Sequence, residues 1–234
     1  MTAQGLLVFD VDSTFIEEEV IELLAETTGR RDEVARVTER AMRGELDFAQ
    51  SLRERVAVLA DLPETVIDDA AAAVTLTPGA AEVVAAARAD GWIVALLSGG
   101  FTAVIERVLD GAVDSSEQSG TEQRVSTGLV IDEIRANTLE IVDGRLTGRA
   151  LGEIVGPQEK ARHLTEIASA HGVPAQRTIA VGDGANDIDM LEAAAVGVAF
   201  CAKPALRPHA DIVVDERDLR IVWERATEVL RSRS

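Results

Sequence analysis

The fold of this chain is decided by an apolar run that ends in two acids one residue apart, Leu6-Leu7-Val8-Phe9-Asp10-Val11-Asp12-Ser13-Thr14. The run predicts a buried strand with Asp10 and Asp12 at its C-terminal end. Because side chains alternate between the faces of a strand, both carboxylates are expected to point the same way. A divalent cation, or a shared proton that raises one pKa, would offset their repulsion. This strand end is therefore a candidate site; alternatively, the acids only solubilise the strand end and cap the next helix.

The composition favours an α/β protein with an aliphatic core. Of the 234 residues, 47% are hydrophobic but only 3% are aromatic, and there is no Tyr. This length suits one sizeable core, or a core domain with a smaller insertion. The net charge of −18 argues against binding to nucleic acid or to an anionic membrane surface.

Cysteine content and the N-terminal sequence indicate the compartment. The single cysteine, Cys201, excludes an internal disulfide framework and fits a reducing environment. No basic segment followed by an apolar signal region begins the sequence, and no apolar run approaches ~18 residues. We expect a soluble, cytoplasmic protein that acts on a small molecule, with a homodimer as one expected assembly.

Strand and helix patterns alternate along most of the chain and predict a Rossmann-like parallel sheet. Further strands are expected at 92–97, 178–181, 196–200 and 211–214, and helices at 78–88, 157–171 and 219–230. In such a sheet the C-terminal strand ends share one edge, which is the usual ligand edge.

Two segments depart from this alternation. Residues 16–74 contain only helical patterns and predict an inserted helical cap, which leaves 1–15 plus 75–234 as the core. Within the core, alternating segments on either side of Asp143-Gly144 predict a small β-hairpin excursion over 129–150. A polar, turn-rich stretch over 110–128 precedes the hairpin and predicts an exposed loop.

Two more strand ends carry groups that suit a phosphate or a cation. Ser98-Gly99-Gly100 would expose backbone N–H groups to a phosphate, although a glycine pair there is at least as often a plain tight turn. Acids return in Gly182-Asp183-Gly184-Ala185-Asn186-Asp187. Asp187 replaces the third glycine of a dinucleotide fingerprint, which argues against an NAD site, and neither acidic loop has EF-hand spacing.

Arg55 lies inside an apolar stripe of the helix expected over 47–59, whereas Arg53 lies on the opposite face. The stripe consists of Phe48, Leu52, Val56 and Leu59. One interpretation is a buried or snorkelling Arg that pairs with an acid of the chain. The other is a clamp for a substrate carboxylate or phosphate, and periodicity does not distinguish the two.

The groups at the strand ends are those that phosphoryl transfer needs. Its anionic transition state is held in line between nucleophile and leaving group, with a cation and positive donors around the phosphoryl oxygens. Mg²⁺ bound by Asp10 and Asp183 would supply the cation. Lys160, near the start of the helix over 157–171, and the N–H groups of Ser98-Gly99 would supply the donors.

These motifs, in this order, resemble those of the haloacid dehalogenase superfamily of phosphatases. The chain is further similar to the phosphoserine phosphatase branch of that superfamily, through Glu17-Glu18-Glu19 and through residues 42–48, 51–56, 142–148 and 200–204. The resemblance implies a haloacid dehalogenase-like α/β core with a helical cap. It also implies Mg²⁺-dependent hydrolysis of O-phosphoserine to serine and phosphate, the last step of serine biosynthesis.

The resemblance also implies a role for each site residue. Asp10 would be the nucleophile that forms an aspartyl-phosphate, and Asp12 would protonate the leaving oxygen and later activate water. Mg²⁺ would be bound by Asp10, Asp183 and the main-chain carbonyl of Asp12. The substrate would be bound at its ammonium by Glu19, at its carboxylate by Arg55, and at its phosphoryl group by Ser98, Gly99, Lys160 and Asn186. Supporting positions are Asp187, Met42, Phe48 and Gly100.

Two other functions stay open on the sequence. A related phosphatase or phosphotransferase of the superfamily would act on another small phosphomonoester. A non-catalytic sensor of a phosphorylated ligand would use the same fold without turnover. The presence of Asp10, Asp12, Lys160 and Asp183 together argues against the sensor, because a sensor has no need of a nucleophile.

Overall fold

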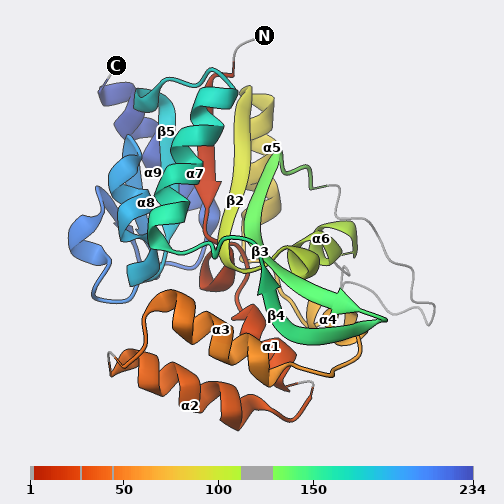
Figure 1. The fold of residues 1–234 in the computed structure, drawn as a ribbon. Coiled ribbons are helices and arrows are strands. Elements are labelled where there is room, and N and C mark those ends of the chain that lie inside the picture. Colours follow the sequence, from red (N-terminus) through yellow and green to blue (C-terminus); the bar gives the residue numbers. More distant parts are fainter. Residues whose placement is uncertain (1–2, 27, 44, 112–128, 234) are drawn as a thin grey trace.

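A mostly parallel sheet forms the centre of the molecule (Figure 1). The computed structural model describes residues 3–26, 28–43, 45–111 and 129–233. Within these ranges the sheet has seven strands in the order β4-β3-β2-β1-β5-β6-β7. All neighbours pair in parallel except β3 and β4, which are antiparallel. The strands are β1 (Gly5–Phe9), β2 (Trp92–Phe101), β3 (Glu133–Val142), β4 (Arg145–Leu151), β5 (Thr178–Gly182), β6 (Val196–Phe200) and β7 (Ile212–Val214). The predicted Rossmann-like α/β core is confirmed.

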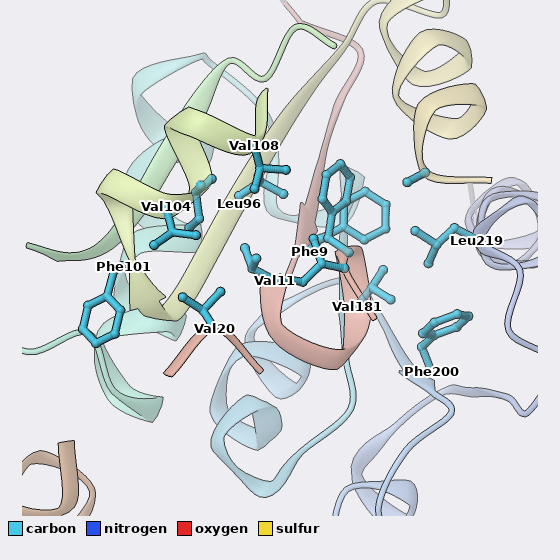
Figure 2. Packing of buried hydrophobic residues seen from close by; sticks show 14 of the residues in the cluster. Phe9, Val11, Val20, Leu96, Phe101, Val104, Val108, Val181, Phe200 and Leu219 are labelled. Atoms are coloured by element: carbon cyan, nitrogen blue, oxygen red, sulfur yellow. The ribbon is translucent and has the colours of Figure 1, made fainter. Parts of the chain in front are cut away.

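The alternation of side chains along β1 creates two hydrophobic layers. Leu7 and Phe9 face a cluster formed with α5 (Ala80–Ala89), α6 (Thr102–Gly111) and α9 (Leu219–Ser232), part of which is shown in Figure 2. Leu6 and Val8 face the other cluster, with α7 (Pro157–Ala170) and α8 (Ile188–Ala193). Because β1 is apolar on both faces, it is buried at the centre of the sheet, as strands of parallel sheets are.

The segment between β1 and α5 contains the helices α1 (Val20–Glu26), α2 (Arg31–Met42), α3 (Phe48–Val58) and α4 (Val66–Ala72). The chain leaves the core at Ile16 and returns at Leu76, and these two residues form an antiparallel bridge. Asp47 caps α3 by accepting a hydrogen bond from the Gln50 N–H, at 2.7 Å. Helices α1 to α3 lie beyond the C-terminal ends of the core strands (Figure 1), which is where a cap over the site is expected.

The hairpin predicted over 129–150 is built into the core sheet, because β3 pairs in parallel with β2. Its second strand, β4, contacts the helical segment: the Asp61 N–H donates to the Leu146 carbonyl, and the Leu146 N–H donates to the Leu62 carbonyl, each at 2.9 Å. The hairpin therefore connects sheet and helical segment. Of the loop predicted over 110–128, residues 112–128 lie outside the described residues.

Short helical turns complete the described elements. They are η1 (Val11–Phe15), η2 (Ala175–Arg177), η3 (Ala185–Asp187) and η4 (Arg207–His209). Two of them, η1 and η3, lie shortly after the core strands β1 and β5 and carry acids of the predicted site.

Candidate active site

A pocket of about 160 Å³ lies at the C-terminal ends of β1, β2 and β5, between the sheet and the helical segment. It brings together groups from both, because its lining consists of Asp10, Asp12, Glu19, Ile21, Phe48, Leu52, Arg55, Gly99, Gly100, Asp183, Asn186 and Lys203. The predicted residues Ser98, Lys160 and Asp187 are fully buried. Of the predicted site residues, only the side chain of Met42 lies outside the described part of the chain.

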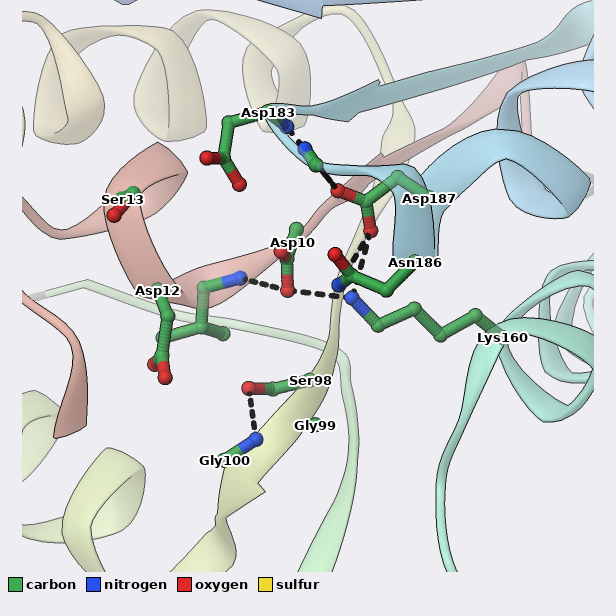
Figure 3. A network of polar contacts seen from close by, with 12 residues as sticks. Asp10, Asp12, Ser13, Ser98, Gly99, Gly100, Lys160, Asp183, Asn186 and Asp187 are labelled. Atoms are coloured by element: carbon green, nitrogen blue, oxygen red, sulfur yellow. Dashed lines mark hydrogen bonds and ion pairs between the residues drawn. The ribbon is translucent and has the colours of Figure 1, made fainter. Parts of the chain in front are cut away.

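Asp10, the residue directly after β1, forms an ion pair with the buried Lys160. Its Oδ1 accepts hydrogen bonds from the Val11 N–H and from Lys160 Nζ, both at 2.7 Å. The same Nζ donates to Asp187 Oδ1 at 2.8 Å (Figure 3). Burial, and then the charge of Asp187, raises the pKa of Asp10 well above its ordinary value, while Lys160 partly offsets this. Burial also disfavours the charge on Lys160, but Asp10 and Asp187 outweigh that effect and raise its pKa.

The sequence predicted that Asp12 points into the site because side chains alternate along a strand. In the structure a turn after the strand, and not this alternation, brings Asp12 to the pocket. The strand ends at Phe9, and Asp12 lies in η1 before Ser13, which has the left-handed φ of 58°. Asp12 Oδ2 accepts from the Val20 N–H at 3.3 Å, while the buried Oδ1 has no hydrogen-bond partner among the described residues. Burial, followed by the charge of Glu19, raises the pKa of Asp12 to about 8. Asp12 can therefore hold a proton at neutral pH and present it from a free oxygen.

The segment Ser98-Gly99-Gly100 is part of β2, whereas the sequence predicted a strand that ends at residue 97, before this segment. The register between β2 and β3 shifts between Leu97 and Phe101, so these three residues form a bulge. The Gly100 N–H donates to Ser98 Oγ at 2.8 Å. A Cβ at position 100 would lie 3.0 Å from Ser98 Oγ and 3.2 Å from Asp12 Oδ1. Glycine at 100 therefore keeps the space between the hydroxyl and the carboxylate open.

Three buried acids form a set of donors that fits Mg²⁺. Carboxylate oxygens of Asp10, Asp183 and Asp187 lie within 4.8 Å of one another. Asp187 Oδ2 is oriented by the N–H groups of Asp183 and Gly184, each at 3.1 Å. Burial raises the pKa of Asp183, partly offset by Lys203. Carboxylate oxygens are hard donors of the kind that Mg²⁺ prefers, and a bound cation would offset the repulsion that Lys160 and Lys203 compensate only in part.

Glu19 and Arg55 contribute opposite charges from the helical segment. Glu19 Oε1 accepts from Ser13 Oγ at 2.9 Å, which joins it to the turn that carries Asp12. Arg55 Nε donates to the Ser51 carbonyl at 3.3 Å, and within the described ranges no carboxylate lies within 4 Å of its guanidinium. Burial lowers the pKa of Arg55, although an arginine stays charged. Its planar donor fork is therefore available to a ligand.

Lys203 is a pocket residue that the sequence reasoning did not assign. Its Nζ lies 3.1 Å from Asp183 Oδ2 and 3.9 Å from Glu19 Oε1. The Lys203 N–H also donates to the Asp183 carbonyl at 2.9 Å. Two signals were available: its place in the segment 200–204, which carries part of the family resemblance, and its position shortly after β6, at the same sheet edge as the predicted acids. A lysine on a loop gives no periodicity that would single it out.

Comparison with known proteins places this chain in a family. The sequence profile of the haloacid dehalogenase-like hydrolases matches residues 7–192, and the chain belongs to that family. The similarity extends to named phosphoserine phosphatases. One from Streptomyces coelicolor is 52% identical over 91% of this chain and 48% of its own length. Another, from Streptococcus thermophilus, is 44% identical over 97% of both chains. The chain thus spans about half the length of the Streptomyces relative and nearly all of the Streptococcus one.

Solved structures agree with the sequence comparison. A structure described as a phospho-aspartyl intermediate analogue of phosphoserine phosphatase superposes with a TM-score of 0.82 at 38% identity, covering 95% of this chain and 99% of that one. A substrate-bound phosphoserine phosphatase complex gives a TM-score of 0.82 at 37% identity, covering 96% and 99%. In the part of this chain that the structure describes, every helix is too short or too polar to cross a membrane.

Proposed function

We propose that this chain is a Mg²⁺-dependent phosphoserine phosphatase, which hydrolyses O-phosphoserine to serine and phosphate through an aspartyl-phosphate on Asp10. The observation that carries the proposal is one pocket with two ends. At one end, Asp10 accepts a hydrogen bond from the buried Lys160. Asp12 lines the same end, and its Oδ1 has no hydrogen-bond partner among the described residues. At the other, Glu19 and Arg55 line the pocket from the helical segment, and the Arg55 guanidinium forms no ion pair with any described residue.

In the first half of the reaction the Asp10 carboxylate attacks phosphorus and the bond to the serine oxygen breaks. Asp12 donates its proton to that oxygen, so serine leaves as a neutral alcohol. The raised pKa of Asp12, about 8, keeps this proton in place at neutral pH. The hydrogen bond from Lys160 Nζ to Asp10 Oδ1 holds the Asp10 carboxylate in position, and the positive charge of Lys160 offsets the negative charge of Asp10.

In the second half a water molecule attacks the phosphorus of the aspartyl-phosphate. Asp12, now ionised, accepts a proton from this water, the bond between Asp10 and phosphorus breaks, and phosphate leaves. Both carboxyl groups then have their starting protonation. Asp10, Asp183 and the main-chain carbonyl of Asp12, with Asp187 in support, would hold Mg²⁺, which when bound offsets negative charge on the phosphoryl oxygens.

Substrate selection rests on the helical segment. Glu19 would accept hydrogen bonds from the substrate ammonium, and Arg55 would donate two to its carboxylate. Ser98, Gly99 and Asn186 would surround the phosphoryl group on the core side. Phe48 closes the pocket above Gly99, because a Cβ at that glycine would lie 2.9 Å from Phe48 Cζ. We further propose a cytoplasmic enzyme of serine biosynthesis, with a homodimer as one assembly state to test.

Phosphate release from O-phosphoserine, with Mg²⁺ and with EDTA, tests the proposal. Sugar phosphates of similar size serve as competing substrates. Turnover of phosphoserine that needs Mg²⁺ and exceeds that of the sugar phosphates is the expected result. Preferred turnover of another phosphomonoester would favour a related phosphatase, and binding of phosphoserine without turnover would favour a sensor.

A further inference from the structure

Asn137 is a buried polar residue that the mechanism above does not use. It lies on β3, is only 1% exposed, and makes one hydrogen bond with each half of its carboxamide. Its Nδ2 donates to the Gly99 carbonyl at 2.9 Å, and its Oδ1 accepts from the Val155 N–H at 2.9 Å. Only this orientation of the carboxamide satisfies both partners, because the flipped one would oppose like groups.

The first partner belongs to the bulge in β2. Leu97 pairs with Arg135 and Phe101 pairs with Asn137, so Ser98, Gly99 and Gly100 together face a single residue of β3. The additional residues of a bulge leave the regular ladder of strand hydrogen bonds. The Gly99 carbonyl is accordingly bound by a side chain from the neighbouring strand.

This contact fixes more than one carbonyl. The Gly99 carbonyl and the Gly100 N–H belong to one planar peptide unit, so holding the carbonyl also sets the direction of the N–H. That N–H donates to Ser98 Oγ at 2.8 Å. The orientation of the Ser98 hydroxyl in the proposed phosphoryl site therefore depends on Asn137 through one rigid peptide.

The second partner belongs to the segment that leads into α7. Val155 precedes Gly156, the N-cap residue of α7, and that helix carries Lys160. One carboxamide thus connects the glycine bulge with the start of the helix that supplies the lysine beside Asp10. A buried side chain whose oxygen and nitrogen each bond a different backbone segment is well suited to hold those two segments in register.

We propose that Asn137 is a positioning residue for phosphoryl transfer, which aligns the Gly99-Gly100 peptide and Ser98 with Lys160; this role rests on the function proposed above. The test is Asn137→Leu, which keeps the branched shape and removes both hydrogen bonds. Thr178→Val is the matched control. Thr178 is also 1% exposed and bonds two backbone groups, the Ala175 carbonyl and the Ala195 N–H, each at 2.8 Å, but at the start of β5 away from the pocket.

We expect Asn137→Leu to lower kcat by roughly 10- to 100-fold, the range for disturbing oriented transition-state donors. KM for phosphoserine should change by less than about threefold, because the Glu19 and Arg55 contacts are untouched. The same fall in kcat should appear with p-nitrophenyl phosphate. Thr178→Val should lower the melting temperature comparably and leave kcat unchanged.

A folded Asn137→Leu protein with wild-type kcat, or one that differs from Thr178→Val in no kinetic constant, would overturn the positioning role. A wild-type protein that hydrolyses neither substrate would instead contradict the proposed function. Hydrogen exchange in the wild-type protein needs no variant: the Asn137 side-chain amide protons should exchange slowly, and their resonances should shift when inorganic phosphate is added with Mg²⁺. Fast exchange without a shift would also reject the proposal.

Discussion

Replacing Arg55 by lysine separates the two interpretations of a charge in an apolar stripe. The substitution keeps the positive charge but removes the planar fork that binds a carboxylate through two hydrogen bonds. In the described structure Arg55 bonds only the Ser51 carbonyl of its own helix, at 3.3 Å, and forms no ion pair. A structural ion pair therefore has little support, and the melting temperature of Arg55→Lys should stay close to that of the wild type.

The size of the expected effect follows from the bonds that are lost. Losing charge-assisted hydrogen bonds to a carboxylate costs ~1.5–3 kcal/mol, which corresponds to a fall in kcat/KM of roughly 10- to 100-fold for phosphoserine. O-phosphoethanolamine is the matched substrate, because it retains the ammonium and phosphoryl groups and lacks only the carboxylate. Its kcat/KM should change little in Arg55→Lys.

Arg53→Lys on the same helix is the control protein, because Arg53 is exposed on the opposite face. It should match the wild type with both substrates. An equal loss of activity on phosphoserine and phosphoethanolamine in Arg55→Lys would refute the binding of the substrate carboxylate by Arg55. A lowered melting temperature with unchanged substrate preference would refute it as well, and would return Arg55 to a structural role.

Three further predictions concern the core side of the pocket. Asp10→Asn should abolish turnover in a folded protein, because the amide retains the shape but is not a nucleophile; residual wild-type kinetics would reject the covalent step. Gly99→Ala should raise KM at least several-fold, since the new Cβ would lie 2.9 Å from Phe48 Cζ and force the Phe48 ring, which lines the pocket, to move; an unchanged KM would show that the ring moves without affecting substrate binding. Mg²⁺ should raise the melting temperature more at pH 8.5 than at pH 6, measured by thermal denaturation against EDTA. Folding raises the pKa values of Asp10, Asp12 and Asp183, so the free energy of unfolding of the metal-free protein falls as pH rises from about 4 toward 8. Mg²⁺ binds the ionised carboxylates of Asp10 and Asp183, so its stabilising effect should grow over the same pH range. A Mg²⁺ effect that shrinks with pH would contradict this assignment.

The predictable part of the fold depends on patterns that are local in sequence. The apolar run over 6–9 predicts β1 because a central strand of a parallel sheet is apolar on both faces, and Asp143-Gly144 predicts the turn between β3 and β4. The place of β3 beside β2 could not be derived in this way. Its alternating pattern fits a separate hairpin as well as an edge of the sheet, and only the parallel pairing of residues 95 and 133 decides between them.

The site was predictable as far as single residues at strand ends allow. Asp10 and Asp183 follow buried strands, whereas Asn137 lies inside a strand and donates a hydrogen bond to a bulge that was not predicted from the sequence. Lys160 was expected to hold a phosphoryl group, and the structure places its ammonium between Asp10 and Asp187. Such contacts join residues up to 150 positions apart, so they depend on the folded topology.

The charges around the pocket give a physical reason for the proposed cation. The described residues that line the pocket, or that form the ion pairs of Lys160 beside it, include three cationic groups, Arg55, Lys160 and Lys203. They also include five carboxylates, those of Asp10, Asp12, Glu19, Asp183 and Asp187. This leaves about two negative charges in a chain whose net charge is −18. Phosphoserine with an ionised phosphate also carries about two negative charges at neutral pH, so it would be repelled from the bare pocket. One divalent cation brings the pocket close to neutrality, and the proton on Asp12 makes it positive. A strongly acidic protein can in this way accept a strongly acidic substrate, because the charge that matters is the local one, within a Debye length of about 8 Å.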